Sequence, residues 1–133
     1  MTHVLLVEDD AMLNDAFSIL LKKQGYGVDT AYNGQEALDQ IKKRRPDLIL
    51  LDLLMPVMDG KDFLRAFDNP THIPIIVFSN LDTKSEVQEA VKLGASRYML
   101  KSWATTKELV RVIHDTLQDA NQAAQQSGIH AKE

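Results

Sequence analysis

An apolar run at residues 4–7, VLLV, gives way at once to three acidic residues at 8–10, EDD. Four residues are too few for a helix, but they suit a strand whose two faces are both buried. The same arrangement recurs at residues 47–52, DLILLD, and at residues 73–79, IPIIVFS, where apolar residues end in a polar one. Two weaker candidates are residues 27–31 and 97–100. The pattern predicts five strands.

Between these runs lie segments with helical spacing and with signals for helix ends. Leu13, Phe17 and the pair at 20–21 recur on one helical face, and Gly25 then ends the pattern as a C-terminal cap. Three pairs match the capping box, in which a cap side chain and a later Glu satisfy free backbone N–H groups. The pairs are Asn33 with Glu36, Thr83 with Glu86, and Thr105 with Glu108. A further helix is expected to begin near residues 59–60 and to end before residues 69–70.

Strands and helices therefore alternate five times, which predicts an α/β fold. Its strands are expected to be parallel, with right-handed crossovers and helices on both faces of the sheet. The last helix begins at Thr105 and places four apolar residues on one face: Leu109, Val112, Ile113 and Leu117. Large apolar residues become few after Asp119. We expect one domain at 1–120 and a polar tail at 121–133, disordered or a frayed helix end.

Composition narrows the class of protein. The chain has 133 residues, of which 44% are hydrophobic, as expected for one ordinary domain. Its formal charge of −4 provides no positive field, so we expect no direct binding of nucleic acid and no membrane surface as partner. It has no cysteine for disulfides or zinc-thiolate sites, and none of its apolar runs is long enough to span a bilayer. A cytoplasmic protein is expected.

Polar side chains with related chemistry follow the predicted strands. They are Glu8, Asp9, Asp52, Ser79 and Lys101. In an open α/β sheet, ligands bind outside the carboxyl ends of the strands, so we expect these residues at one site. Converging carboxylates repel one another unless a cation is bound or one pKa rises, and all-oxygen ligands favour Mg²⁺. Together the residues supply a carboxylate nucleophile, a cation site, a hydroxyl donor and an ammonium, which suits phosphate chemistry.

A simpler interpretation stays open for part of this cluster. Acidic residues gather at strand ends because those ends are solvated and precede helix N-termini, and Asp10 is explained by helix capping alone. Asp52 is harder to explain in this way, because it lies between an apolar strand and the residues Leu53-Leu54.

Four motifs in order resemble the receiver domain of bacterial two-component response regulators. They are VEDD at 7–10, LDLLMPVMDG at 51–60, Ser79, and YMLK at 98–101. The resemblance covers about residues 3–118. It implies a flavodoxin-like, doubly wound sheet of five parallel strands in the order 2-1-3-4-5, with five helices.

The resemblance also implies a role for each motif residue. Asp52 is the phosphoacceptor that takes a phosphoryl group from a sensor histidine kinase or a phosphotransfer protein. Mg²⁺ is bound by Asp9, by Asp52 and by the backbone carbonyl of Leu54, with Glu8 acting mainly through water. Lys101 and Ser79 contact the phosphoryl group, and Ser79 and Tyr98 form the switch. Phosphorylation is expected to change the surface formed by the fourth helix, fifth strand and fifth helix. This surface would contact an unknown downstream protein.

Several positions depart from the family pattern. Ser102 follows Lys101 where the family has a cis-proline; a non-proline cis bond costs about 2.5 to 4 kcal/mol, so we predict a trans bond. Asn80 replaces a small residue beside the phosphoryl site. Leu54 and Leu81 stand where the family tunes phosphoryl lifetime, and neither side chain can orient an attacking water, which predicts slow self-dephosphorylation.

Two other functions are compatible with parts of the sequence. A receiver-like adaptor that needs no phosphorylation fits Asn80 and Ser102, but it does not explain why the acidic residues and Lys101 are present. A phosphoaspartyl phosphatase needs a second carboxylate two residues after the nucleophile, where this chain has Leu54. We therefore expect a signalling switch that takes part in its own phosphorylation and dephosphorylation rather than an enzyme.

Overall fold

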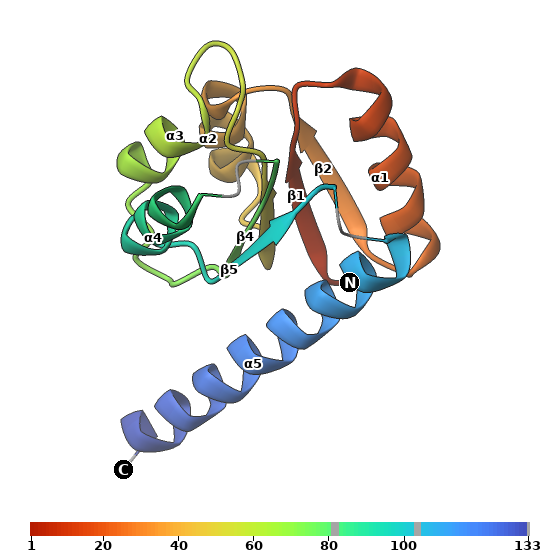
Figure 1. Cartoon of the computed structure of the whole chain (residues 1–133). Coiled ribbons are helices and arrows are strands. Elements are labelled where there is room, and N and C mark those ends of the chain that lie inside the picture. Colours follow the sequence, from red (N-terminus) through yellow and green to blue (C-terminus); the bar gives the residue numbers. More distant parts are fainter. Residues whose placement is uncertain (81–82, 103–104, 133) are drawn as a thin grey trace.

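The structure, a computed structural model, describes residues 1–80, 83–102 and 105–132, with side chains as far as Ala123. Strands and helices alternate along the chain (Figure 1). The strands are β1 (His3–Val7), β2 (Gly27–Ala31), β3 (Leu48–Leu51), β4 (Ile75–Ser79) and β5 (Arg97–Leu100). The helices are α1 (Ala11–Lys23), α2 (Gly34–Lys43), α3 (Gly60–Ala66), α4 (Lys84–Lys92) and α5 (Thr106–Lys132). The predicted alternation is confirmed.

The five strands form one parallel sheet in the order β2-β1-β3-β4-β5, as the resemblance implies. Strand β1 pairs with both β2 and β3, so successive strands are added on one side of β1 first and on its other side afterwards. In a doubly wound sheet, such a switch point leaves a crevice at the carboxyl ends of the central strands. The sheet order therefore places the residues after β1 and β3 side by side.

Both faces of the sheet are covered, which explains the continuous apolar runs. Successive strand residues point to opposite faces, so the core forms two clusters. Leu5, Ile49 and Val77 pack on the side of α2, α3 and α4, which contribute buried residues such as Phe63. On the opposite face, the other strand residues pack against buried residues of α1 and α5, such as Ile113. Figure 1 shows these two helical layers on either side of the sheet.

The helix starts follow the predicted capping signals. The side chains of Asn33 and Thr83 each accept a hydrogen bond from the backbone N–H of the Glu three residues later. The Asp59 side chain accepts from the Asp62 N–H, and the Thr105 side chain accepts from the Glu108 N–H. These bonds satisfy N–H groups that have no partner within the helix.

Helix α1 differs from the expected pattern. Its buried residues are Asn14, Ser18 and Leu21, whereas Leu13 and Phe17 are only partly covered. Leu21 of the predicted stripe is fully buried, but the rest of the stripe lies beside the most buried face, because part of that face meets backbone carbonyls at the strand ends.

Helix α5 continues through the polar segment after residue 120 and extends beyond the sheet (Figure 1). A domain boundary at residue 120 stays a prediction. Among the described residues, no helix combines the length and the apolar character needed to cross a membrane.

Candidate functional site

Three carboxylates come together where β1 and β3 end. The strands are paired as far as Val7 and Leu51, and the Asp52 N–H donates to the Val7 carbonyl at 3.0 Å. This register brings Glu8, Asp9 and Asp52 so close that one oxygen from each lies within 4.8 Å of the others. Glu8 and Asp52 are buried, whereas Asp9 is exposed. The convergence predicted for the strand ends is confirmed.

Lys101 reaches this cluster from the neighbouring part of the sheet. Its backbone N–H donates to the Ser79 carbonyl at 3.0 Å, which extends the pairing of β4 with β5 beyond the strand ends. Its Nζ atom lies 2.6 Å from Glu8 Oε1 and 3.2 Å from Asp52 Oδ2. One ammonium group is therefore shared between two buried carboxylates.

The ionisation of Glu8 and Lys101 reflects this arrangement. Burial raises the pKa of Glu8 to about 7, although the hydrogen bond from Lys101 opposes the shift, and the charge of Asp52 raises it further. Burial lowers the pKa of Lys101, but the hydrogen bond to Glu8 and the charge of Asp52 outweigh that effect and raise it above its ordinary value. Lys101 stays protonated, and the negative charge around it is only partly compensated.

The donor set fits a hard divalent cation. Mg²⁺ takes oxygen ligands and is typically held by one or two protein carboxylates while water or phosphate oxygens fill the other positions. Asp9 is the exposed member of the cluster, and Asp52 lies beside it. The backbone N–H of Leu54 donates to Asp52 Oδ1 at 3.3 Å, which places the Leu54 backbone next to the same carboxylate. A cation there would offset the excess of carboxylate charge.

The segment after Asp52 folds back tightly. The Gly60 N–H donates to the Leu53 carbonyl, and a Cβ atom on Gly60 would lie 2.5 Å from the Asp52 carbonyl oxygen. Within this loop, Val57 and Met58 adopt positive φ angles of 48° and 67°, a conformation that side chains with a Cβ disfavour. The loop is held in a conformation that keeps α3 close to the acidic cluster.

Ser79 and Tyr98 lie on neighbouring strands, Ser79 at the end of β4 and Tyr98 on the edge strand β5. Ser79 is fully buried at the end of β4, and Tyr98 is partly buried on β5. Burial raises the pKa of Tyr98, while a hydrogen bond between its side chain and that of Ser79 opposes the rise. The two residues expected to form the switch are thus in direct contact.

The positions that depart from the family pattern have mixed outcomes. Asn80 is exposed, and it lines a hollow of about 270 Å³ together with Lys101 and Ser102. The peptide bond between Lys101 and Ser102 is trans, so that prediction is confirmed. The Leu54 side chain is exposed. Leu81 lies outside the described residues.

The sequence interpretation missed two features near the site. Asn14 on α1 is 1% exposed, and its amide donates to the backbone carbonyls of Glu8 and Ala31. The available signal was a polar residue next to the apolar stripe of α1, four positions after the acidic triplet. A set of ion pairs also links α3 to α4: Lys61 with Glu86 at 2.5 Å and with Glu89 at 3.3 Å.

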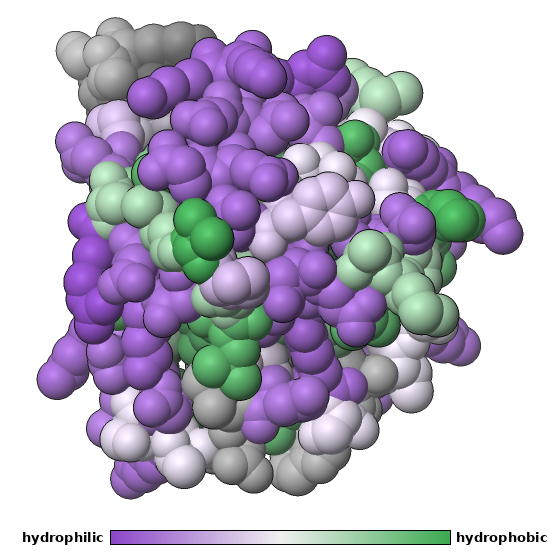
Figure 2. All heavy atoms as spheres, turned by 90° about the horizontal axis from the view of Figure 1, so that it is seen from above, coloured by the Kyte–Doolittle hydropathy of each residue, from purple (hydrophilic) through white to green (hydrophobic). Residues whose placement is uncertain are grey.

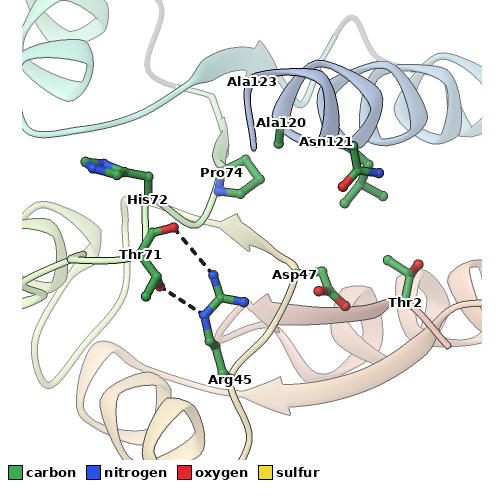
Figure 3. Close-up of a pocket in the computed structure, with 10 residues that line it drawn as sticks. Thr2, Arg45, Asp47, Thr71, His72, Pro74, Ala120, Asn121 and Ala123 are labelled. Atoms are coloured by element: carbon green, nitrogen blue, oxygen red, sulfur yellow. Dashed lines mark hydrogen bonds between the residues drawn. The ribbon is translucent and has the colours of Figure 1, made fainter. Parts of the chain in front are cut away.

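Other surfaces of the molecule are less suited to this chemistry. The view onto the molecule from above is mostly hydrophilic, with small scattered apolar groups (Figure 2). A hollow of about 670 Å³ lies at the opposite end of the sheet, between α5 and the segments that precede β1, β3 and β4. There Arg45 donates to Thr71, and the residues that line the hollow come from separate elements (Figure 3). The hollow is lined by none of the three carboxylates.

Comparison with known proteins identifies the family and the fold. The family model of the response regulator receiver domain matches residues 4–114. The chemotaxis protein CheY4 of Vibrio cholerae is 30% identical, with a TM-score of 0.81 over 87% of this chain and 98% of that chain. A receiver domain protein of Methanospirillum hungatei JF-1 has the same fold, with a TM-score of 0.86 at 23% identity over 92% of this chain and 98% of the other.

Longer proteins also contain this fold. NtrX from Brucella abortus matches 96% of this chain with a TM-score of 0.88 at 22% identity, although the match covers only 30% of that protein. The order of the sheet, the acidic cluster beside Lys101 and the family match over most of the chain lead to one assignment. This chain belongs to the receiver domain family of two-component response regulators.

Proposed function

We propose that this chain is a phosphorylation-dependent switch in which Asp52 accepts a phosphoryl group from a sensor histidine kinase or a phosphotransfer protein. The observation that carries the proposal is the environment of the Asp52 carboxylate. It is buried, it lies 3.2 Å from the Lys101 ammonium, and it shares a cluster with the carboxylates of Glu8 and Asp9. A buried carboxylate with a neighbouring ammonium and a place for a cation is suited to receive phosphate.

In the proposed reaction, an Asp52 carboxylate oxygen forms a bond to phosphorus while the bond from phosphorus to the donor histidine nitrogen breaks. Asp9, Asp52 and the Leu54 carbonyl would hold Mg²⁺, with Glu8 acting mainly through water, and the cation would neutralise charge on the phosphoryl oxygens. Lys101 exchanges part of its contact with Asp52 for one phosphoryl oxygen. The Ser79 hydroxyl donates to another.

The new charge then changes the conformation. Phosphorylation adds about −1.5 to −2 charge and strong acceptor oxygens, which favours the conformer that brings Ser79 and Lys101 closest. Since Ser79 is hydrogen-bonded to Tyr98, its movement toward the phosphoryl group breaks that bond and releases Tyr98. The altered surface consists of α4, β5 and α5, which contact the downstream protein. A change from 1:99 to 99:1 needs roughly 5.5 kcal/mol, which a few charge-assisted hydrogen bonds can supply.

The phosphorylated form is expected to persist. An attacking water needs a polar side chain to orient it, and the exposed Leu54 side chain offers none. With Leu81 as the second apolar residue of the pair, slow hydrolysis of the acyl phosphate is expected.

Incubation with Mg²⁺ and a small phosphodonor such as acetyl phosphate tests the proposal. We expect one phosphoryl group per chain, retained in acid and released by hydroxylamine, as for an acyl phosphate. Asp52→Asn should abolish the label. Asp10→Asn is a matched control, because Asn also caps a helix and Asp10 already serves as the cap of α1.

The outcomes separate the alternatives. An unlabelled wild-type protein that also fails to bind beryllofluoride with Mg²⁺ contradicts the proposal and favours a phosphorylation-independent adaptor. A label that survives Asp52→Asn contradicts the assignment of the phosphoacceptor.

A further inference from the structure

Asn14 is a buried polar side chain beside the acidic cluster. It lies in the first turns of α1 with 1% of its surface exposed. Its Nδ2 atom donates to the backbone carbonyl of Glu8 at 3.0 Å and to that of Ala31 at 3.4 Å. The amide thus joins the ends of two neighbouring strands, β1 and β2, to the helix that follows the acidic residues.

The Glu8 carbonyl belongs to the peptide group that joins Glu8 to Asp9. Because a peptide group is planar, holding this carbonyl also fixes the orientation of the Asp9 N–H and restricts the direction of the Asp9 side chain. The N–H group of Glu8 donates to the same Ala31 carbonyl at 3.0 Å, so the two peptide groups that flank Glu8 are both held.

Asp9 depends on this backbone more than the other two carboxylates do. Glu8 and Asp52 each contact the Lys101 ammonium. In the described part of the chain, by contrast, no hydrogen bond or ion pair holds the Asp9 side chain, which is exposed. Its place in the cluster is therefore set by the backbone of residues 8–10.

We infer that Asn14 is a positioning residue for the cation site, which orients the peptide between Glu8 and Asp9 so that the Asp9 carboxylate faces Asp52. This inference rests on the proposed function, because it concerns the Mg²⁺ that the acidic cluster would hold. Asn14 contacts neither the cation nor the phosphoryl group, and it acts only through the backbone. Groups that orient metal ligands typically change metal affinity about 10- to 100-fold when they are removed.

The test measures binding of Mg²⁺ alone to the intact chain, by isothermal titration and by chemical shifts of the amides of residues 8–10. Asn14→Leu removes the donor at similar volume, and Asn14→Ser keeps a smaller donor. Ser18→Ala is the position-matched control, because Ser18 is buried one turn further along the same face of α1. Leu21→Ala is the stability-matched control, because Leu21 is fully buried in the core and distant in sequence from the acidic residues.

We expect the dissociation constant for Mg²⁺ to rise at least tenfold in Asn14→Leu, with partial recovery in Asn14→Ser. Both controls should remain within about twofold of the wild type, with circular dichroism showing that each variant is folded at the titration temperature. Equal affinity in Asn14→Leu and wild type overturns the inference, as does an equal loss in Leu21→Ala. A wild type that binds no Mg²⁺ at millimolar concentration overturns it as well.

Labelling by acetyl phosphate separates this inference from the proposed function. If Asn14→Leu binds Mg²⁺ normally while Asp52 is labelled, only the role of Asn14 is wrong. If Asn14→Leu binds Mg²⁺ weakly but wild-type Asp52 takes no label, the phosphoacceptor proposal is wrong and the positioning role stands. When both hold, a saturating concentration of Mg²⁺ should return the labelling rate of Asn14→Leu to that of the wild type.

Discussion

Replacement of Lys101 by Met tests how the acidic cluster is stabilised without metal. The Lys101 side chain is 15% exposed, and its Nζ atom contacts carboxylates whose side chains are only 3% and 6% exposed, those of Glu8 and Asp52. Met has a similar length and fills the same space without the charge. The substitution therefore leaves two buried carboxylates without their shared cation.

The expected loss of stability follows from this geometry. Removing one partner of a buried ion pair typically costs about 3 to 5 kcal/mol. Because Lys101 is not fully buried, we expect the lower end, about 3 kcal/mol at pH 8. With a urea m-value of about 1 to 3 kcal/mol/M, the midpoint should fall by about 1 to 3 M.

The loss should depend on pH. Burial raises the pKa of Glu8 to about 7, so at pH 5 this carboxyl is protonated in the folded protein and needs no cation. Only Asp52 then lacks a partner, and we expect the cost of Lys101→Met at pH 5 to be about half of that at pH 8. Urea denaturation followed by circular dichroism in EDTA measures both values.

Lys61→Met provides a matched control. Lys61 also pairs with two carboxylates, Glu86 and Glu89, but these side chains are 28% and 41% exposed. Although the Glu86 oxygen that contacts Lys61 is itself buried, both side chains are partly exposed, so the loss should be smaller and nearly independent of pH between 5 and 8. Equal losses in the two variants at pH 8, or a Lys101→Met loss that does not change with pH, would refute the reasoning.

Three further predictions concern stability. Glu8→Gln should become more stable than the metal-free wild type as pH rises. Burial raises the pKa of Glu8 from 4.5 to about 7 in the folded protein, so the stability that protonated Glu8 contributes is full below pH 4.5 and is lost by about pH 7. The loss is worth roughly 3 kcal/mol at most, and denaturation in EDTA across this range checks its sign. Gly60→Ala should cost about 1 to 3 kcal/mol, because the added Cβ meets the Asp52 carbonyl oxygen at 2.5 Å; thermal unfolding measures the loss, and an unchanged melting temperature contradicts the close approach. Asn33→Ala should cost about 1 kcal/mol through loss of the bond that its side chain accepts from the Glu36 N–H, whereas Asn33→Ser should retain most of the stability in the same assay.

The sequence predicts the sheet and the acidic cluster because both depend on local signals. Apolar runs of strand length end in Glu8, Asp52 and Ser79, and parallel strands place their carboxyl ends at one edge. The adjacency of β1 and β3 is different, since nothing in the two runs specifies that they pair. The strand order came from the family resemblance, and the structure confirms it.

Other features depend on tertiary contacts that a linear pattern does not contain. Asn14 is buried because two strand ends present carbonyls to its amide, and one of these, that of Ala31, is 17 residues away in the chain. The bond between Lys101 and Glu8 joins residues 93 positions apart. The positive φ angles of Val57 and Met58 follow from a loop closed by other segments, since the Met58 carbonyl accepts a bond from the Gly34 N–H. Residue type alone predicts none of these.

The single ammonium at the site connects cation binding to phosphoryl binding. When every group is ionised, the three carboxylates and Lys101 leave two net negative charges in a largely buried site. Burial, together with the charge of Asp52, raises the pKa of Glu8 to about 7, so uptake of a proton by Glu8 is one way to reduce this charge. A divalent cation can also neutralise this negative charge, and it then weakens the attraction of Glu8 and Asp52 for the Lys101 ammonium. Lys101 is then available to a phosphoryl oxygen, so metal binding should precede and promote phosphoryl transfer rather than merely accompany it.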